Sequence, residues 1–135
     1  MNKEKQYQKE IEPRKKNWLM GDYPLWLWVS YNSKIKFMPM TTGVYRVLSV
    51  SASHSPIFET NVNFIESAFD IRKFFFNKYH QDLLSLDDIL QHQYEVLFSA
   101  AFRFKHKKEL KDYYRHLKKK SIKIYIKYWI RRHFW

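Results

Sequence analysis

Between Ser85 and Phe102 the sequence keeps the period of an α-helix over four turns. Ser85-x-x-Asp88 is a helix start of the capping-box type, and Asp87 and Asp88 suit the positive end of the helix dipole. The stripe behind this start consists of Leu86, Ile89, Leu90, Gln93, Tyr94, Leu97, Phe98, Ala101 and Phe102. A helix with one apolar stripe must bury it against other elements. This stretch therefore predicts a packed and mostly helical C-terminal half.

Two further helices are predicted on either side of this one. The first begins near Asn63, where Asn63-x-x-Glu66 resembles a capping box, and the second lies around Leu110–Leu117. Aromatic residues near helical spacing run along both, namely Phe69, Phe75, Phe76, Tyr79, Tyr113 and Tyr114. We interpret these stripes as core packing rather than as ligand platforms, because one apolar stripe facing the core is the usual helical pattern.

A short β segment is predicted at about residues 34–48. Lys34–Met38 alternates polar and apolar residues, as a strand with one buried face does. Thr41–Leu48 is rich in residues that favour extended backbone. A helix that is apolar nearly all round, Pro24–Asn32, precedes this segment. The expected fold class is therefore α+β, with the short β segment flanked by helices.

Length and composition allow one domain at most. The chain has 135 residues, of which 45% are hydrophobic, so it is too apolar to be disordered. A net charge of +12 favours anionic partners, and no cysteine is present to form a disulfide or a thiolate metal site. The charged N-terminus does not resemble a secretion signal, and Leu25–Val29 is far shorter than the ~20 residues of a membrane span. We expect a chain that does not cross a bilayer.

The stretch Trp18–Trp28, WLMGDYPLWLW, places one carboxylate, Asp22, in a dense aromatic and aliphatic setting. A glycine before Asp22 and Pro24 after it favour a bend, and the tryptophans offer flat surfaces of the kind that a sugar ring stacks against. An acid at such a bend is a candidate general base. The alternative is that Asp22 only caps the helix that Pro24 begins, which is a standard helix start. Both interpretations stay open from the residues alone.

Residues 20–55, MGDYPLWLWVSYNSKIKFMPMTTGVYRVLSVSASHS, resemble the C-terminal part of bacterial family 2 glycosyltransferases. The ordered run of GDYPLWL, KIKF, GVYRV and SASHS carries this resemblance, which covers roughly residues 12–76, about half of the chain. These inverting enzymes have the GT-A fold, and the bacterial ones transfer sugars from nucleotide-sugar donors to glycan or lipid-linked acceptors during polysaccharide synthesis. The resemblance implies the same activity here.

The resemblance also implies roles for individual residues. Asp22 matches the acid that deprotonates the acceptor hydroxyl, and Trp18, Tyr23 and Trp26 would shape the acceptor side. Arg46 and His54 fall in the segment that returns to the donor diphosphate in related enzymes. Arg46 would offer a forked charge to phosphate, and His54 would hydrogen-bond it or a metal. The alternatives are a paired surface arginine and a solvated loop histidine.

The chain departs from the family in two respects. Many relatives carry a histidine two residues after the arginine, where this chain has Leu48, which puts a metal role in doubt. Nothing in the sequence matches the nucleotide-binding half with its DxD motif, and the adjacent acidic pair Asp87-Asp88 opens a helix instead. We expect a fragment without the donor-binding half. The family uses Mn²⁺ or Mg²⁺, whereas no cofactor is expected for such a fragment, which should be inactive alone.

The C-terminal stretch is strongly basic. Arg103 to Arg132 contains 13 of the 25 basic residues, opposed only by Glu109 and Asp112, and aromatic residues and isoleucines interleave with them. Ile122–Ile126 alternates like a strand, while the residues around Trp129 fit a helix.

Such a segment is typical of an amphipathic helix lying on an anionic membrane. A solvated basic helix face is the plain alternative. A non-catalytic module that binds anionic lipid or nucleic acid through residues 103–135 is the alternative function, although the sequence has no nucleic-acid-binding signature and nucleic acid ranks below lipid. The expected location is the cytoplasm, at the inner face of the bacterial membrane. The expected organisation is a polar lead-in (1–17), an acceptor-side segment (18–60) and a helical basic extension (61–135).

Overall fold

The structure is a computed structural model that describes residues 3–15, 18–41, 43–44, 55–79 and 85–134. Every regular element within these ranges is a helix. The helices are α1 (Lys3–Glu10), α2 (Glu12–Lys15), α3 (Tyr23–Asn32), α4 (Phe58–Tyr79), α5 (Leu86–Arg103), α6 (Lys107–His116) and α7 (Ile122–Phe134). None of these helices is long and apolar enough to cross a membrane.

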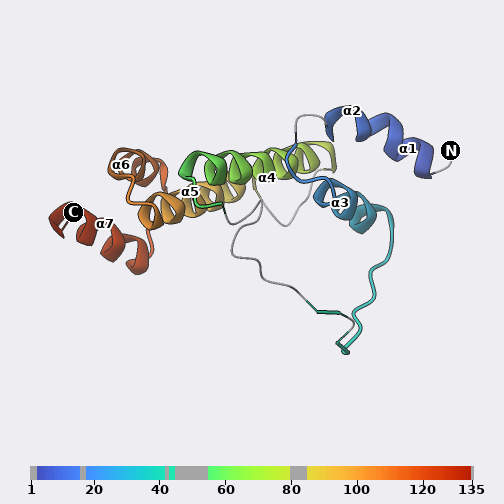
Figure 1. The fold of residues 1–135 in the computed structure, drawn as a ribbon. Helices are drawn as coiled ribbons and strands as arrows, with labels where there is room; N and C mark the ends of the chain where they lie inside the picture. Colours follow the sequence, from blue (N-terminus) through green and yellow to red (C-terminus); the bar gives the residue numbers. More distant parts are fainter. Residues whose placement is uncertain (1–2, 16–17, 42, 45–54, 80–84, 135) are drawn as a thin grey trace.

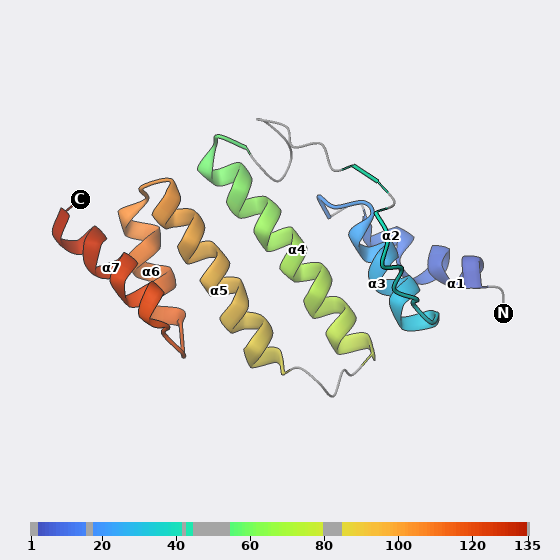
Figure 2. The same cartoon turned by 90° about the horizontal axis from the view of Figure 1, so that it is seen from below.

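The long helix α4 runs through the middle of the molecule (Figure 1). It has 22 residues, which corresponds to a length of about 33 Å. Figure 2 shows α5 beside α4 and running in the opposite direction, with α6 and α7 on the far side of α5 and α1 to α3 near the other end of α4. The two ends of α4 therefore belong to two different packing regions.

Each region has its own hydrophobic core. One core joins Phe58 of α4 to residues of α5, α6 and α7 and to Leu117, which follows α6; the helical members are Phe98, Ala100, Ala101, Leu110 and Ile124. The other joins Ile71 and Phe75 near the end of α4 to Tyr7, Ile11 and Trp28. Trp28 is one of the two buried residues of α3, and its ring meets that of Tyr7 edge-on at 5.3 Å.

The prediction of an α+β fold is wrong. Lys34–Met38 is irregular chain in the structure, and no described residue belongs to a strand. Ile35 and Phe37, the apolar members of the alternating run, are 73% and 84% exposed. A strand needs a partner for its backbone groups and cover for its apolar face, and this segment instead runs away from the helices (Figure 1). Residues 45–48 of the predicted β segment lie outside the described residues.

The helix predictions agree better with the structure. The helix predicted over Pro24–Asn32 is confirmed as α3, and the segment around Leu110 as α6. The helix start at Ser85 is confirmed in detail: the Ser85 side chain accepts from the Asp88 backbone N–H, and the Asp88 carboxylate accepts from the Ser85 backbone N–H. The residues of α7 are helical, which decides between the strand and helix patterns of that segment.

The predicted start of the preceding helix near Asn63 is wrong. Helix α4 begins at Phe58, so Asn63-x-x-Glu66 lies inside the helix. The residue that organises this end is Asn61, whose buried amide donates to the carbonyl oxygen of Ile57 and accepts from Arg103 at 3.1 Å. Asn61 thus joins the start of α4 to the end of α5, a tertiary role that local spacing does not reveal.

Candidate functional site

Asp22 stands directly before the first turn of α3. The turn contains a proline, and the Asp22 backbone oxygen accepts a hydrogen bond of 3.0 Å from the Trp26 N–H. Its backbone is in the right-handed helical region rather than the extended region usual for an N-cap, and its side chain makes no capping hydrogen bond. Asp22 therefore holds the cap position without acting as a side-chain cap. Its carboxylate is exposed to solvent.

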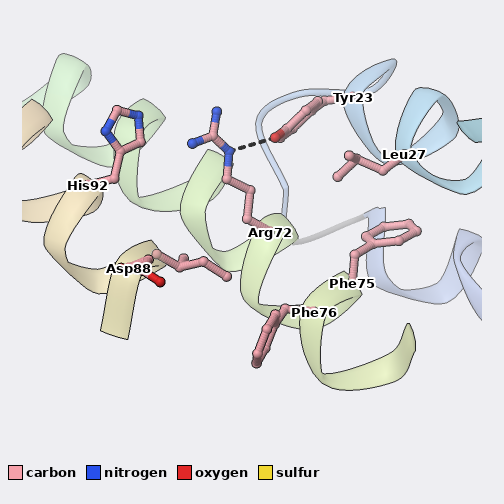
Figure 3. Close-up of a pocket in the computed structure, with 8 residues that line it drawn as sticks. Tyr23, Leu27, Arg72, Phe75, Phe76, Asp88 and His92 are labelled. Carbon is pink, nitrogen blue, oxygen red and sulfur yellow. Dashed lines mark hydrogen bonds between the residues drawn. The ribbon is translucent and has the colours of Figure 1, made fainter. Parts of the chain in front are cut away.

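A cavity of about 280 Å³ lies beside the start of α3, between α3, α4 and α5 (Figure 3). Tyr23, the residue next to Asp22 in the sequence, lines this cavity, whereas Asp22 is not one of its lining residues. The lining residues are Tyr23, Leu27, Arg72, Phe75, Phe76, Asp88, Ile89 and His92. Four of these side chains are apolar, and the others bring a phenol, a guanidinium, a carboxylate and an imidazole to the same space.

Arg72 is the central polar residue of the cavity. Its Nε donates a hydrogen bond of 2.6 Å to the phenolic oxygen of Tyr23, and its guanidinium lies 4.8 Å from the centre of the Phe69 ring. Figure 3 shows Arg72 reaching from α4 between Tyr23 of α3 and His92 of α5. A half-buried guanidinium held in this way is well placed to meet an anionic or hydroxyl-bearing group.

Asp88 and His92 form the α5 side of the cavity. The Asp88 carboxylate accepts hydrogen bonds from the Ser85 hydroxyl at 2.7 Å and from the Ser85 backbone N–H at 3.1 Å, and these bonds lower the pKa of Asp88. The Asp88 carboxylate is thus used mainly to cap the start of α5. The His92 ring meets the Phe69 ring at 5.5 Å, edge to face, and is largely open to solvent. Of these two side chains, His92 is therefore the more accessible to a ligand in the cavity.

The structure brings one of the predicted substrate-binding residues, Tyr23, into this cavity. Trp18 does not line this cavity; its half-buried ring packs against Phe74, with ring centres 5.6 Å apart, at the edge of the core. Trp26 is 64% exposed on the outer face of α3. The predicted residues Arg46 and His54 lie outside the described residues.

Sequence reasoning did not identify Arg72 or His92. Arg72 lies three residues after Phe69 and three before Phe75, within the aromatic stretch that was interpreted as core. A cation inside an aromatic helical stretch is a signal that could have marked it, because such residues are seldom buried without a partner. His92 follows the polar Gln91 on an exposed face and carries no comparable signal.

The described residues do not supply a site for the divalent metal that the resemblance implies. Mg²⁺ and Mn²⁺ are held by several oxygen ligands, and no group of three or more His, Cys, Asp or Glu side chains gathers within the described ranges. The residues present do not fit such an ion, and no catalytic step in this chain is assigned to one.

Comparisons with known proteins add no family. No protein-family model, no curated protein and no solved structure matches the chain.

Proposed function

We propose that this chain is the acceptor-side part of an inverting family 2 glycosyltransferase, with Asp22 as the general base. The observation that carries the proposal is that the Asp22 side chain, at the start of α3, is exposed and makes no capping hydrogen bond. A general base needs an accessible lone pair within reach of the proton that it removes. This state, together with the GDYPLWL motif, supports the assignment.

In the proposed reaction the acceptor hydroxyl oxygen attacks the anomeric carbon of a nucleotide sugar. A new carbon–oxygen bond forms while the bond to the diphosphate breaks, and the hydroxyl proton passes to Asp22. The leaving group is the nucleoside diphosphate. Binding of the donor is assigned to residues outside these 135, because the sequence contains no match to the family's donor-binding half. The chain alone is not expected to turn over.

The outer face of α3 supports this division of the enzyme. Pro24 and Trp28 are the buried residues of α3, while Leu25, Trp26 and Tyr31 remain exposed. A helix that is apolar on all sides is expected to be covered on all sides. In the proposal, the donor-binding half covers this face, including Trp26.

The cavity beside Tyr23 is assigned to the acceptor. Its apolar wall suits the ring faces of a sugar or the first part of a lipid carrier, and the Arg72 guanidinium suits a hydroxyl or phosphate of the acceptor. The hydrogen bond from Arg72 to Tyr23 holds the residue next to Asp22 and so helps to place the base.

The test joins this chain to the donor-binding half of a family 2 enzyme and measures sugar transfer. Asp22→Asn should lower turnover by a factor of about 10² to 10⁴, the usual contribution of a general base, and leave donor binding intact. Asp70→Asn is the matched control, because Asp70 is an exposed α4 carboxylate that pairs only with Lys73 in the described residues. Full activity of the Asp22→Asn enzyme would contradict the assignment of Asp22 as the general base.

A second measurement tests where the donor binds. Titration of the 135-residue chain with UDP- and GDP-sugars in the presence of Mn²⁺ should give no heat of binding. Metal-dependent binding would place a donor site within this chain and contradict the proposed division.

A further inference from the structure

Helix α7 has two opposite faces. Ile124 and Arg131 are 8% and 1% exposed on the side that meets the rest of the molecule. On the other side Ile122, Tyr125, Ile126 and Trp129 are 79%, 59%, 50% and 47% exposed. These four residues follow the spacing i, i+3, i+4, i+7, so they form one continuous stripe along the helix. We call this stripe the outer face of α7.

Specific contacts fix which side of α7 points outward. The Tyr128 ring stacks on Tyr114 of α6, with ring centres 3.8 Å apart and planes 5° from parallel. Arg131 donates a hydrogen bond to the backbone oxygen of Phe102 in α5, and its guanidinium lies 4.7 Å from the centre of the Phe102 ring. With Tyr128 and Arg131 held inward, the outer face cannot turn toward the core. Figures 1 and 2 show α7 at the edge of the molecule, next to α6.

Positive charge borders the outer face. Lys107 and Lys111 of α6 and Arg132 of α7 line a cavity of about 300 Å³ where the two helices meet, together with Leu110, Tyr128 and Arg131. Among the described residues, no carboxylate lines this cavity. Lys123 is exposed near the start of α7, and residues 113–135 contain eight basic residues and no acidic one.

The acidic residues of α6 face elsewhere. Glu109 and Asp112 line a neighbouring hollow with Lys108, Lys111, Tyr113 and Arg115, so Lys111 borders both hollows. The Glu109 carboxylate lies 3.5 Å from the His106 ring, across one turn at the start of α6. Neither of these carboxylates lines the cationic cavity between α6 and α7, and two of its cations, Lys107 and Arg132, do not line the hollow that holds Glu109 and Asp112.

We infer that the outer face of α7 docks on the surface of an anionic lipid bilayer, with lipid phosphate groups in the cationic cavity of Lys107, Lys111 and Arg132. Apolar side chains in a stripe, bordered by lysine and arginine and including a tryptophan, are the pattern of a helix that lies in a membrane interface. Basic residues next to the bilayer add attraction to anionic headgroups. This inference goes beyond the proposed function, because it concerns α7, whereas Asp22 lies at the start of α3.

Charge and side-chain chemistry favour a bilayer over two other occupants. A second copy of the chain would bring two strongly basic surfaces together, which like-charge repulsion opposes. Nucleic acid would be stacked by aromatic rings, whereas two of the four residues in the outer face are isoleucines, which gain more from burial among acyl chains.

The test is flotation of the 135-residue chain with vesicles of phosphatidylcholine alone and of phosphatidylcholine with 30% phosphatidylglycerol (a composition on the order of that of an anionic leaflet). The wild-type chain should bind the anionic vesicles and bind the neutral ones at least about tenfold more weakly. Brominated acyl chains should quench the fluorescence of Trp129, and Trp129→Phe should remove that part of the quenching.

Two sets of substitutions separate the apolar and ionic contributions. Ile122→Ser, Ile126→Ser and Trp129→Ser together should lower partitioning at least about 50-fold. Their control is Ile35→Ser, Phe37→Ser and Met38→Ser, which replaces three apolar residues outside the helices that are each more than half exposed. Lys107→Gln, Lys111→Gln and Arg132→Gln should lower partitioning about 100-fold at low salt, about fivefold for each charge. Lys5→Gln, Lys9→Gln and Lys34→Gln are the matched exposed control.

Each variant is compared with the wild type by far-UV circular dichroism, so that loss of binding is counted only for folded chains. Equal binding by the α7 variants and their controls would overturn the inference. So would equal binding to neutral and anionic vesicles, or tighter binding to a single-stranded oligonucleotide than to anionic vesicles. A dimer in sedimentation that the outer-face substitutions dissolve would assign the face to a second copy instead.

Discussion

Arg72 of α4 donates a hydrogen bond of 2.6 Å to the phenolic oxygen of Tyr23, the first residue of α3 and 49 positions earlier in the chain. This bond ties the residue next to Asp22 to the long central helix. Leu19 adds a second tie, because its backbone N–H donates to the buried hydroxyl of Ser67 at 2.8 Å. The segment that carries Asp22 is therefore placed by α4 as well as by its own helix.

A double-mutant cycle measures the tie between Tyr23 and Arg72. Tyr23→Phe and Arg72→Met should each lower the free energy of unfolding by about 1–2 kcal/mol, because a hydrogen bond with a charged donor is lost. The two effects should be coupled by at least about 0.5 kcal/mol in urea denaturation. Tyr125→Phe is the control, since Tyr125 is an exposed tyrosine of α7, and it should change little. Additive effects at Tyr23 and Arg72 would contradict the bond.

Phe98 is predicted to be among the most costly residues to truncate. It is fully buried in the core that joins α4, α5, α6 and α7. Phe98→Ala should lower the free energy of unfolding by about 3–5 kcal/mol, because it removes apolar contacts and leaves a cavity. Phe37→Ala, at a site 84% exposed, should change it by less than about 0.5 kcal/mol. Similar effects at the two sites in urea denaturation would contradict the assignment of this core.

The helices that could be predicted are those whose signals are local. The start of α5 depends on Ser85 and Asp88, which are three residues apart, and the structure has both hydrogen bonds of that capping box. The proline that opens α3 acts within one turn. By contrast, the alternating run Lys34–Met38 predicts a strand only if another segment pairs with it, and no described residue does so.

The residues of the candidate site also fall into those marked by local sequence and those placed by tertiary contacts. Asp22 and Tyr23 belong to a short motif, so both could be named as candidates from the sequence, and the structure places Tyr23 at the cavity. Arg72 enters the site through the packing of α3 on α4, a contact between residues 49 positions apart. The packing of Trp18 is a further tertiary feature, because its half-buried ring contacts Phe74 of α4, which the sequence motif does not show.

The ion pair between Glu10 and Lys78 predicts a dependence of stability on pH. The hydrogen bond from Lys78 lowers the pKa of Glu10 below its ordinary value of 4.5. The unfolded chain therefore binds this proton more tightly than the folded chain. The stabilisation is present above the unfolded pKa and is lost as the pH falls through the folded pKa.

Glu10→Gln tests this dependence. Both side chains of the pair are 26% exposed, so the contribution is modest. Between about pH 5 and pH 3, the free energy of unfolding should fall less steeply in Glu10→Gln than in the wild type, as measured by urea denaturation at each pH. Glu59→Gln, at an exposed residue of α4, should follow the wild type. Identical slopes for Glu10→Gln and the wild type would contradict the pair.

Gln91 of α5 is predicted to hold the connection that leads into α7. Its side-chain oxygen accepts from the backbone N–H groups of Lys118 and Lys119 at 2.9 and 3.1 Å, and its nitrogen donates to the Lys119 oxygen at 2.6 Å. Gln91→Ala removes all three bonds and should lower the free energy of unfolding by about 1–3 kcal/mol.

The effect of Gln91→Ala should also be local. Lys118 and Lys119 lie in the connection between α6 and α7, so hydrogen exchange should become faster in α7 than in α4, because the connection can open while the α4–α5 pair stays closed. Gln93→Ala, two residues further along the same helix, removes no hydrogen bond from this connection and is the control. If α4 and α7 lose protection equally in Gln91→Ala, the connection does not open separately, and α7 is held to the molecule mainly by Tyr128 and Arg131.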